Sequence, residues 1–135
     1  MARPLASRHM KPATAGFTLI ELIVVFAILA LLISVAVPRY FSHIERAKEA
    51  TLKQDLSVMR DAIDKFYADK GRYPDTLEEI VKERYIREVP IDPFTDSASS
   101  WTVLPPADGK EKGQVYDVKS GADGKSSDGK AYSEW

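Results

Sequence analysis

The sequence lacks cysteine altogether and has only two histidines in its 135 residues. Without cysteine, no disulfide can stabilise a small exported domain, and no thiol is available as a nucleophile. The histidines, His9 and His43, form no metal-binding motif, and no glycine-rich loop is present that could cradle a phosphate. We therefore expect a protein that is not an enzyme and that binds no nucleotide.

An excess of positive charge is also missing. The chain has 19 lysines and arginines against 20 aspartates and glutamates, and the two signs are interspersed beyond the N-terminal region. Such a surface has no basic stripe that could follow a nucleic-acid backbone. We expect no nucleic-acid partner.

The sequence does contain a long apolar run, residues 17–37, in which Glu21 is the only ionisable side chain. As a helix, this run would be about 32 Å long, which matches the hydrocarbon core of a bilayer. A carboxylate inside a membrane is costly unless a cation pairs with it. We predict a membrane-spanning and assembly helix over residues 17–38, with a cation close to Glu21.

A short basic leader, residues 1–16, precedes this run and contains no acidic residue. Its small-residue boundary at Gly16 comes before the apolar run, whereas a secretory signal has its cleavage site after the apolar region. Cleavage at Gly16 would therefore leave the helix on the protein. Translation could begin at Met1 or at Met10. The basic leader predicts a cytoplasmic N-terminus, with residues 39–135 on the other side of the membrane.

The string GFTLIELIVVFAILALLISVAVPRY, residues 16–40, closely resembles the N-terminal signature of type IV pilins and of the pseudopilins of type II secretion. The resemblance implies that a prepilin peptidase cuts after Gly16 and methylates the new terminal amine of Phe17. It also implies that Glu21 pairs with the terminal amine of a neighbouring subunit during assembly. A freed amine would supply the cation that Glu21 requires.

Beyond the apolar run, Pro38 predicts a kink or local unwinding. A helical pattern follows to about residue 70, where Gly71 and Pro74 predict the end of the helix. Charged pairs, Glu49 with Lys53 and Asp61 with Lys65, have the spacing that supports the exposed face of a helix. The residues spaced three or four apart along the opposite stripe are Phe41, Ile44, Lys48, Leu52, Leu56, Met59, Ile63 and Phe66.

The segment ADKGRYPDTLEEIVKERYIREVPIDPF, residues 68–94, resembles the stretch that follows the stem in the major, G-type pseudopilin of type II secretion. Asp75 or Thr76 is expected to cap a short helix that ends near Arg84, with Glu78 or Glu79 completing a capping box. The β-prone runs 101–104 and 115–118 predict a small antiparallel sheet that one face of the stem must cover.

The predicted fold is therefore α+β and pilin-like. A long N-terminal α-helix, with a transmembrane half and an amphipathic half, packs on a small antiparallel β-sheet. The expected organisation is a leader (1–16), a transmembrane and assembly helix (17–38) and a periplasmic globular domain (39–135).

Calcium is the one cofactor that the resemblance implies. Subunits of the G type commonly bind it in a loop after the last strand, and this chain has Gly-Ala-Asp-Gly at residues 121–124 and an acid at Asp128. Asp123 and Asp128 are the candidate ligands, since Ca²⁺ prefers oxygen donors. The same Asp-Gly pairs are equally typical of turns. In that alternative, Tyr132 and Trp135 close the loop by packing on the sheet.

By resemblance, the chain is a structural subunit, the major pseudopilin, which polymerises into a pseudopilus that drives protein export across the outer membrane. The alternative is a type IV pilin of a surface fibre for adhesion, motility or DNA uptake. A plain anchor that keeps its leader is a third possibility. The implied location is the bacterial inner membrane and then the periplasmic pseudopilus. The implied partners are prepilin peptidase, further copies of the chain, minor pseudopilins and the inner-membrane assembly platform.

Overall fold

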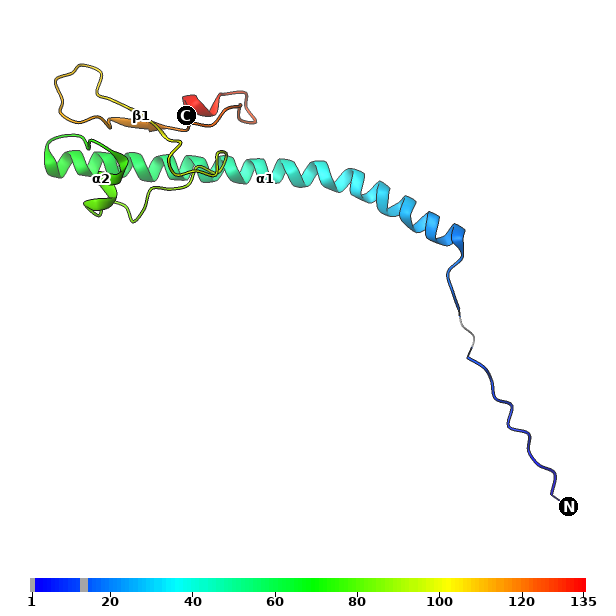
Figure 1. Ribbon diagram of the computed structural model, residues 1–135. Helices are drawn as coiled ribbons and strands as arrows, with labels where there is room; N and C mark the ends of the chain where they lie inside the picture. Colours follow the sequence, from blue (N-terminus) through cyan, green and yellow to red (C-terminus); the bar gives the residue numbers. More distant parts are fainter. Residues whose placement is uncertain (1, 13–14) are drawn as a thin grey trace. The chain divides into compact units, whose positions relative to one another are not determined.

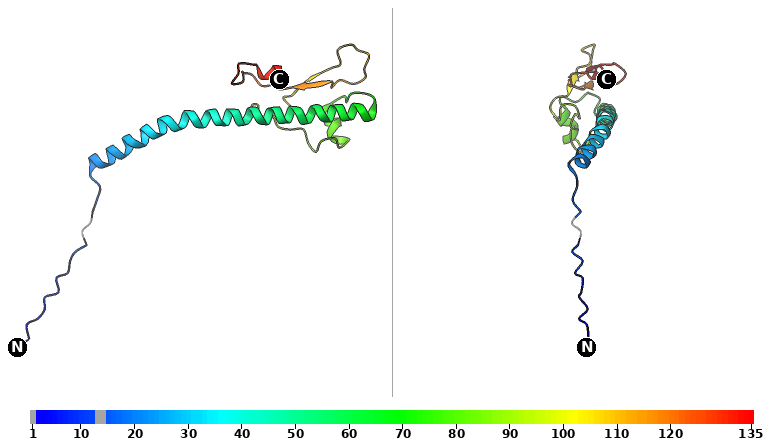
Figure 2. Two further views of the ribbon diagram at one scale, coloured as in Figure 1. Left: turned by 180° about the vertical axis from the view of Figure 1, so that it is seen from behind. Right: turned by 90° about the vertical axis from the view of Figure 1, so that its right-hand side faces the viewer.

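The computed structural model describes residues 2–12 and 15–135, so that Met1, one of the two candidate starts, lies outside the described residues. The chain divides into two compact units, one up to Arg39 and one spanning Tyr40–Trp135. The predicted α+β class is confirmed (Figures 1 and 2). The elements in chain order are α1 (Leu19–Lys70), α2 (Leu77–Lys82), β1 (Thr102–Leu104), β2 (Asp117–Lys119) and a 3₁₀ turn (Tyr132–Glu134).

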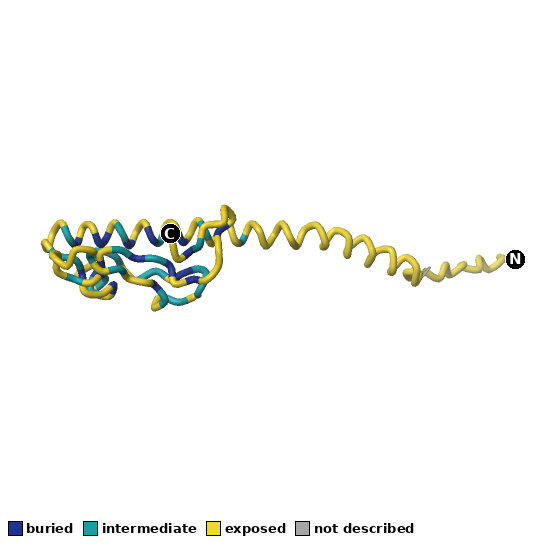
Figure 3. Tube along the Cα trace, turned by 90° about the horizontal axis from the view of Figure 1, so that it is seen from above, coloured by how far each residue is buried: buried dark blue, intermediate teal, exposed yellow. Residues whose placement is uncertain are grey.

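The first unit holds the apolar run, which forms the beginning of α1. Every residue of the run is exposed, as the uniform colouring of this part of Figure 3 shows. Of the kink or local unwinding predicted at Pro38, the unwinding is wrong, because Pro38 lies inside α1, and the kink stays a prediction. A proline removes only its own N–H from the ladder, so the helix loses one hydrogen bond to the carbonyl of Ser34 and continues.

The ends of α1 follow from residues that contact the helix termini. The helix begins at Leu19 and not at Phe17, because Thr18 caps it through its hydroxyl. At the other end, Gly71 takes a φ of 69° and donates its N–H to the carbonyl of Tyr67 at 2.9 Å. That left-handed conformation is the one that glycine adopts without strain, and it ends the helix where the sequence predicted.

The core of the second unit is built on one stripe of α1. The predicted residues from Leu52 to Phe66 are buried, but Phe41 and Lys48 are exposed and Ile44 is only half-buried. The buried stripe is therefore shorter than predicted, since within Tyr40–Trp135 the described elements cover only the later turns of α1. The residues that complete the core are Leu77, Ile80, Trp101, Val115, Val118, Ala122 and Tyr132.

Helix α2 is capped by Thr76, whose hydroxyl accepts the N–H of Glu79 at 3.2 Å. The Glu79 carboxylate accepts the N–H of Asp75 at 2.7 Å, one residue earlier than in the predicted capping box, and forms an ion pair with Arg72. This guanidinium lowers the pKa of Glu79. The helix is shorter than predicted because Arg84 takes a φ of 64°, which no helix accommodates. Ile80 is fully buried.

The predicted antiparallel sheet is confirmed, although its strands have only three residues each. Thr102, Val103 and Leu104 pair with Lys119, Val118 and Asp117 in that order. The second strand begins two residues later than predicted. The N–H of Val115 bonds the carbonyl of Pro74 instead of the other strand, whereas the N–H of Tyr116 still bonds the carbonyl of Leu104 at 2.8 Å. So small a sheet needs a covering element, and Val118 is buried in the same core as the stripe of α1.

A carboxylate that the sequence analysis did not single out lies fully buried beside this core. Asp92 accepts the hydroxyl of Ser120 at 2.5 Å and the N–H of Phe94 at 2.9 Å. It thereby connects the turn after residue 91 to the segment that follows β2. Burial and the nearby Asp92 raise the pKa of Asp55 on α1.

Candidate functional site

The junction between Gly16 and Phe17 lies in an exposed segment before α1. Phe17 is 84% exposed. A methyl group added at Gly16 would meet nothing within 4 Å, and the φ of this glycine is not in the left-handed region. The fold therefore gives no steric reason for glycine at this position.

Glu21 and Thr18 form a reciprocal capping box at the start of α1. The N–H of Glu21 donates to the Thr18 hydroxyl at 3.2 Å, and the N–H of Thr18 donates to the Glu21 carboxylate at 3.5 Å. Sequence reasoning missed this pair, although the Thr-x-x-Glu spacing before an apolar run is its usual signature. The second bond is long, so the carboxylate keeps most of its capacity to accept a stronger donor.

The apolar half of α1 is long and apolar enough to cross a membrane. A window within this helix has a mean hydropathy of 3.0, and none of it is buried against the described residues. A helix that is apolar on all sides needs an apolar surrounding, which here has to come from lipid or from other chains. The role of residues 17–38 as a membrane-spanning and assembly helix stays a prediction.

The structure does not bring the candidate calcium ligands into a metal centre. Asp128 accepts the hydroxyl of Ser126 at 2.6 Å, and this hydrogen bond is the main reason that its pKa is lowered. Asp123 is exposed. Within residues 2–12 and 15–135, no group of three or more His, Cys, Asp or Glu could hold a metal ion. Two carboxylates are few for an ion that takes about six to eight oxygens. These two side chains alone do not form a calcium site, and calcium binding stays a prediction.

The loop is instead connected to α1 through Glu49. Its carboxylate accepts the N–H of Ser127 at 2.8 Å, the hydroxyl of Ser127 at 3.1 Å and the hydroxyl of Tyr132 at 3.2 Å. The predicted Glu49–Lys53 pair is wrong: Lys53 lies over the Trp135 ring, with its Nζ 4.8 Å from the ring centre. Sequence spacing could not reveal the partners of Glu49, because Ser127 and Tyr132 both lie more than 70 residues away in the chain.

The aromatic residues near the C-terminus do close the loop, as the alternative interpretation expected. Tyr132 is 6% exposed and stacks on Phe94, with ring centres 4.1 Å apart. Trp135 meets Tyr132 edge to face at 5.3 Å. Burial, followed by the bond to Glu49, raises the pKa of Tyr132 to about 12. The packing partners include Phe94 and α1, and not the sheet alone.

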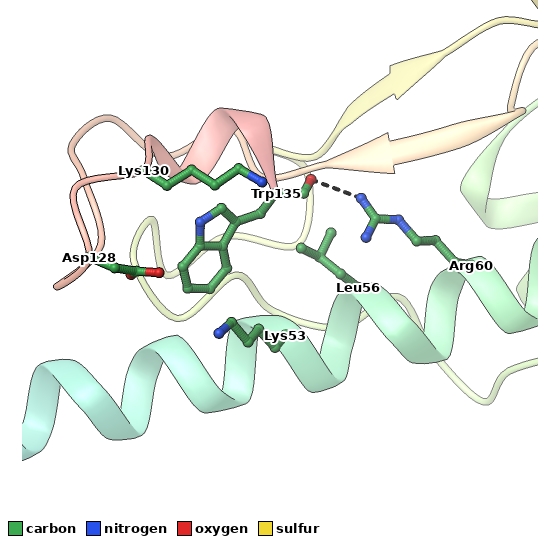
Figure 4. A pocket seen from close by; sticks show the side chains of 6 residues that line it. All are labelled: Lys53, Leu56, Arg60, Asp128, Lys130 and Trp135. Carbon is green, nitrogen blue, oxygen red and sulfur yellow. Dashed lines mark hydrogen bonds between the residues drawn. The ribbon is translucent and has the colours of Figure 1, made fainter.

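A cavity of about 310 Å³ lies between α1 and the C-terminal residues. Figure 4 shows Trp135 between Lys53 of α1 and Lys130 of the loop. Arg60 donates to the main-chain oxygens of Trp135 at 2.8 Å and Val118 at 3.0 Å, and to the carboxylate of Asp117 at 2.8 Å. These bonds hold the last residues against the helix.

The fold and the N-terminal site together define a pilin-type subunit: a capped apolar helix preceded by an exposed glycine junction, and a small α+β unit built on the later part of the same helix. The family described as the prokaryotic N-terminal methylation motif matches residues 11–37.

Relatives with similar sequences indicate the same class of protein. The type II secretion system core protein G of Pseudomonas aeruginosa is 32% identical over 79% of this chain and 93% of its own length. The core protein G of Klebsiella pneumoniae is 33% identical over 81% of this chain and 85% of its own length. The type IV major pilin of Myxococcus xanthus is 38% identical over 53% of this chain and 33% of the pilin. No solved structure matches the chain significantly. The chain belongs to the family of type II secretion system core protein G.

Proposed function

We propose that this chain is the major pseudopilin of a type II secretion system, a structural subunit and not an enzyme. The observation that carries the proposal is the match to core protein G over most of both chains. The exposed apolar half of α1 supports it, since a polymer of such helices would cover the surface that the single chain leaves open.

Processing at the Gly16–Phe17 bond is the first step of the proposed function. A prepilin peptidase would hydrolyse this bond, which leaves a carboxylate on Gly16 and a free amine on Phe17, and the amine would then receive a methyl group. The exposure of Phe17 and the absence of any local steric need for Gly16 support this step. Hydrolysis leaves the Thr18–Glu21 cap in place, because both residues follow the cut.

Assembly would then depend on Glu21. An acid surrounded by lipid is costly, and the long bond from Thr18 compensates it only weakly. The methylated amine of a neighbouring copy is a cation that could pair with it. We propose that the inner-membrane assembly platform and minor pseudopilins organise this step, and that Tyr40–Trp135 lies in the periplasm.

A type IV pilin of a surface fibre is the second candidate. The match to the Myxococcus xanthus pilin favours it, but that match covers only 53% of this chain. The core protein G relatives extend over the α+β unit as well.

The experiment that tests the processing step is intact-mass analysis and N-terminal sequencing of the membrane-bound protein, in hosts with and without prepilin peptidase. We expect a chain that begins at N-methylated Phe17 in the first host and a chain with its leader in the second. A Gly16→Val variant should keep its leader, whereas the neighbouring Ala15→Val control should lose it. An intact leader in the peptidase-containing host would refute the pilin-type pathway.

The export role needs a separate measurement. Deletion of the gene in its own host, followed by complementation, should abolish and then restore the appearance of exported proteins in the medium. Normal export together with lost surface fibres would favour the type IV pilin instead.

A further inference from the structure

The C-terminal segment, residues 120–135, is fixed to α1 by residues on one face of the helix. Glu49, Lys53, Leu56 and Arg60 are spaced by four, three and four, so they lie on the same side. Glu49 accepts three hydrogen bonds from the segment, and Arg60 donates one to the main chain of Trp135. The Glu49 carboxylate thus binds the loop of the segment, and the Arg60 guanidinium binds its last residue.

The loop within this segment uses its own polar groups to form a turn. Lys125 and Ala131 form an antiparallel bridge, and the N–H of Ser126 donates to the carbonyl of Lys130 at 2.8 Å. The N–H of Gly129 donates to the carbonyl of Ser126 at 2.9 Å. The Asp128 carboxylate is likewise engaged by the Ser126 hydroxyl.

The Glu49 carboxylate therefore ties the turn to a rigid helix. A bound cation would have the same role if metal closed the loop. It differs from a cation in the groups it selects. A carboxylate gathers N–H and O–H donors, and the donors here come from Ser127 and Tyr132. A cation gathers oxygens, and among the described residues the loop brings together no group of three or more carboxylate or imidazole side chains.

We propose that the Glu49 carboxylate closes the C-terminal loop onto α1, so that this subunit needs no calcium to order its last residues. The loop is then ordered from within the chain, and its order is independent of the divalent cations outside it.

Hydrogen exchange of the full chain in detergent micelles, followed by mass spectrometry of peptides covering residues 124–135, tests this proposal. In Glu49→Ala, exchange of these amides should accelerate about tenfold or more, because the carboxylate-bound N–H of Ser127 and the Tyr132 hydroxyl lose their acceptor. Asp61→Ala removes an acid of the same helix that pairs only with exposed Lys65, and it should exchange like the wild type.

Wild-type exchange should be the same with a chelator and with added calcium chloride. Protection that is lost on chelation and regained with calcium chloride would overturn the proposal, and so would a Glu49→Ala variant that exchanges like the wild type. Peptides covering the buried stripe of α1 report whether Glu49→Ala is still folded. If they also lose protection, Glu49→Gln decides the matter. Its amide oxygen can accept the Ser127 N–H and the Tyr132 hydroxyl, but its amide nitrogen cannot accept the Ser127 hydroxyl. Exchange slower than in Glu49→Ala therefore supports the proposal, and exchange as fast as in Glu49→Ala refutes it.

Discussion

The two halves of α1 share one continuous helix but bury their surfaces differently. In the first half, up to Arg39, apolar side chains occupy all sides and every one is exposed. In the second half, one stripe from Leu52 to Phe66 is buried, and charged residues occupy the other side. Helix formation is therefore a local property, whereas the distribution of apolar residues around the helix decides its environment. The first half requires a surrounding that the single chain does not provide.

Removing the one acid of the first half should have the largest effect. Glu21→Ala should lower the amount of assembled fibre and the export of proteins by about tenfold or more, since the charge pair between copies disappears. The melting temperature of the detergent-solubilised chain should not change, because Glu21 lies outside the unit that holds the buried core. The yield of fibres sheared from the cells measures assembly, and Asp61→Ala is the control variant. Normal assembly of Glu21→Ala would rule out a role for this acid.

A matched pair of leucines compares the halves directly. Leu56 is 2% exposed and Leu29 is 46% exposed. Leu56→Ala should lower the free energy of unfolding by about 3 kcal/mol, because it leaves a cavity in a packed core. Leu29→Ala should change it by less than about 0.5 kcal/mol. Urea titration of both variants in micelles measures the difference. Equal effects would mean that the buried stripe does not carry the stability of the unit.

Asp92→Ala should lower the free energy of unfolding by about 2 kcal/mol, because the Ser120 hydroxyl and the Phe94 N–H lose their acceptor. Asp123→Ala is the matched control, since Asp123 is an exposed acid of the same unit. Thermal unfolding of both variants, with and without a chelator, gives the comparison. If the melting temperature of Asp123→Ala and that of the chelated wild type are both lower than that of the untreated wild type, calcium contributes to the fold.

Alkaline pH should weaken the second half through its tyrosines. Burial and Glu49, with smaller contributions from Glu45 and Asp128, raise the pKa of Tyr132 to about 12. A phenol whose pKa is higher in the folded state stabilises the protein fully below its ordinary pKa near 10 and loses this contribution as the pH rises through about 12. In Tyr132→Phe, the fall in unfolding free energy between pH 10 and 12 should be smaller than in the wild type. An identical fall in both proteins would exclude this phenol as its source.

The smallest effect is expected at the exposed face of the same half. Asp61 and Lys65 form an ion pair at 2.9 Å, and both side chains are mostly exposed. Asp61→Ala should lower the unfolding free energy by only about 0.3 to 0.5 kcal/mol, and less at high salt. Urea titrations at low and high ionic strength measure it. A loss comparable to that of Leu56→Ala would contradict the view that these charges mainly solvate the helix.

Features of the fold could be predicted where the chemistry is local. The cap at Thr76 lies within a few residues of the N–H that it accepts. The roles of Gly16 and Glu21 stay predictions. The Thr18–Glu21 box was missed although its spacing was visible. The partners of Glu49 could not be found by spacing, because its donors come from the other end of the chain.

By itself, the sequence determined which segments form the two α-helices and which half of the long helix is apolar on all sides. These properties depend on hydrophobic spacing, on Gly71 and on charge, all of which act over a few residues. Only the tertiary structure decided that Asp92 is buried and that Glu49 receives the C-terminal loop. Both depend on chain segments that meet after folding, and no local pattern encodes which donors a carboxylate will find there.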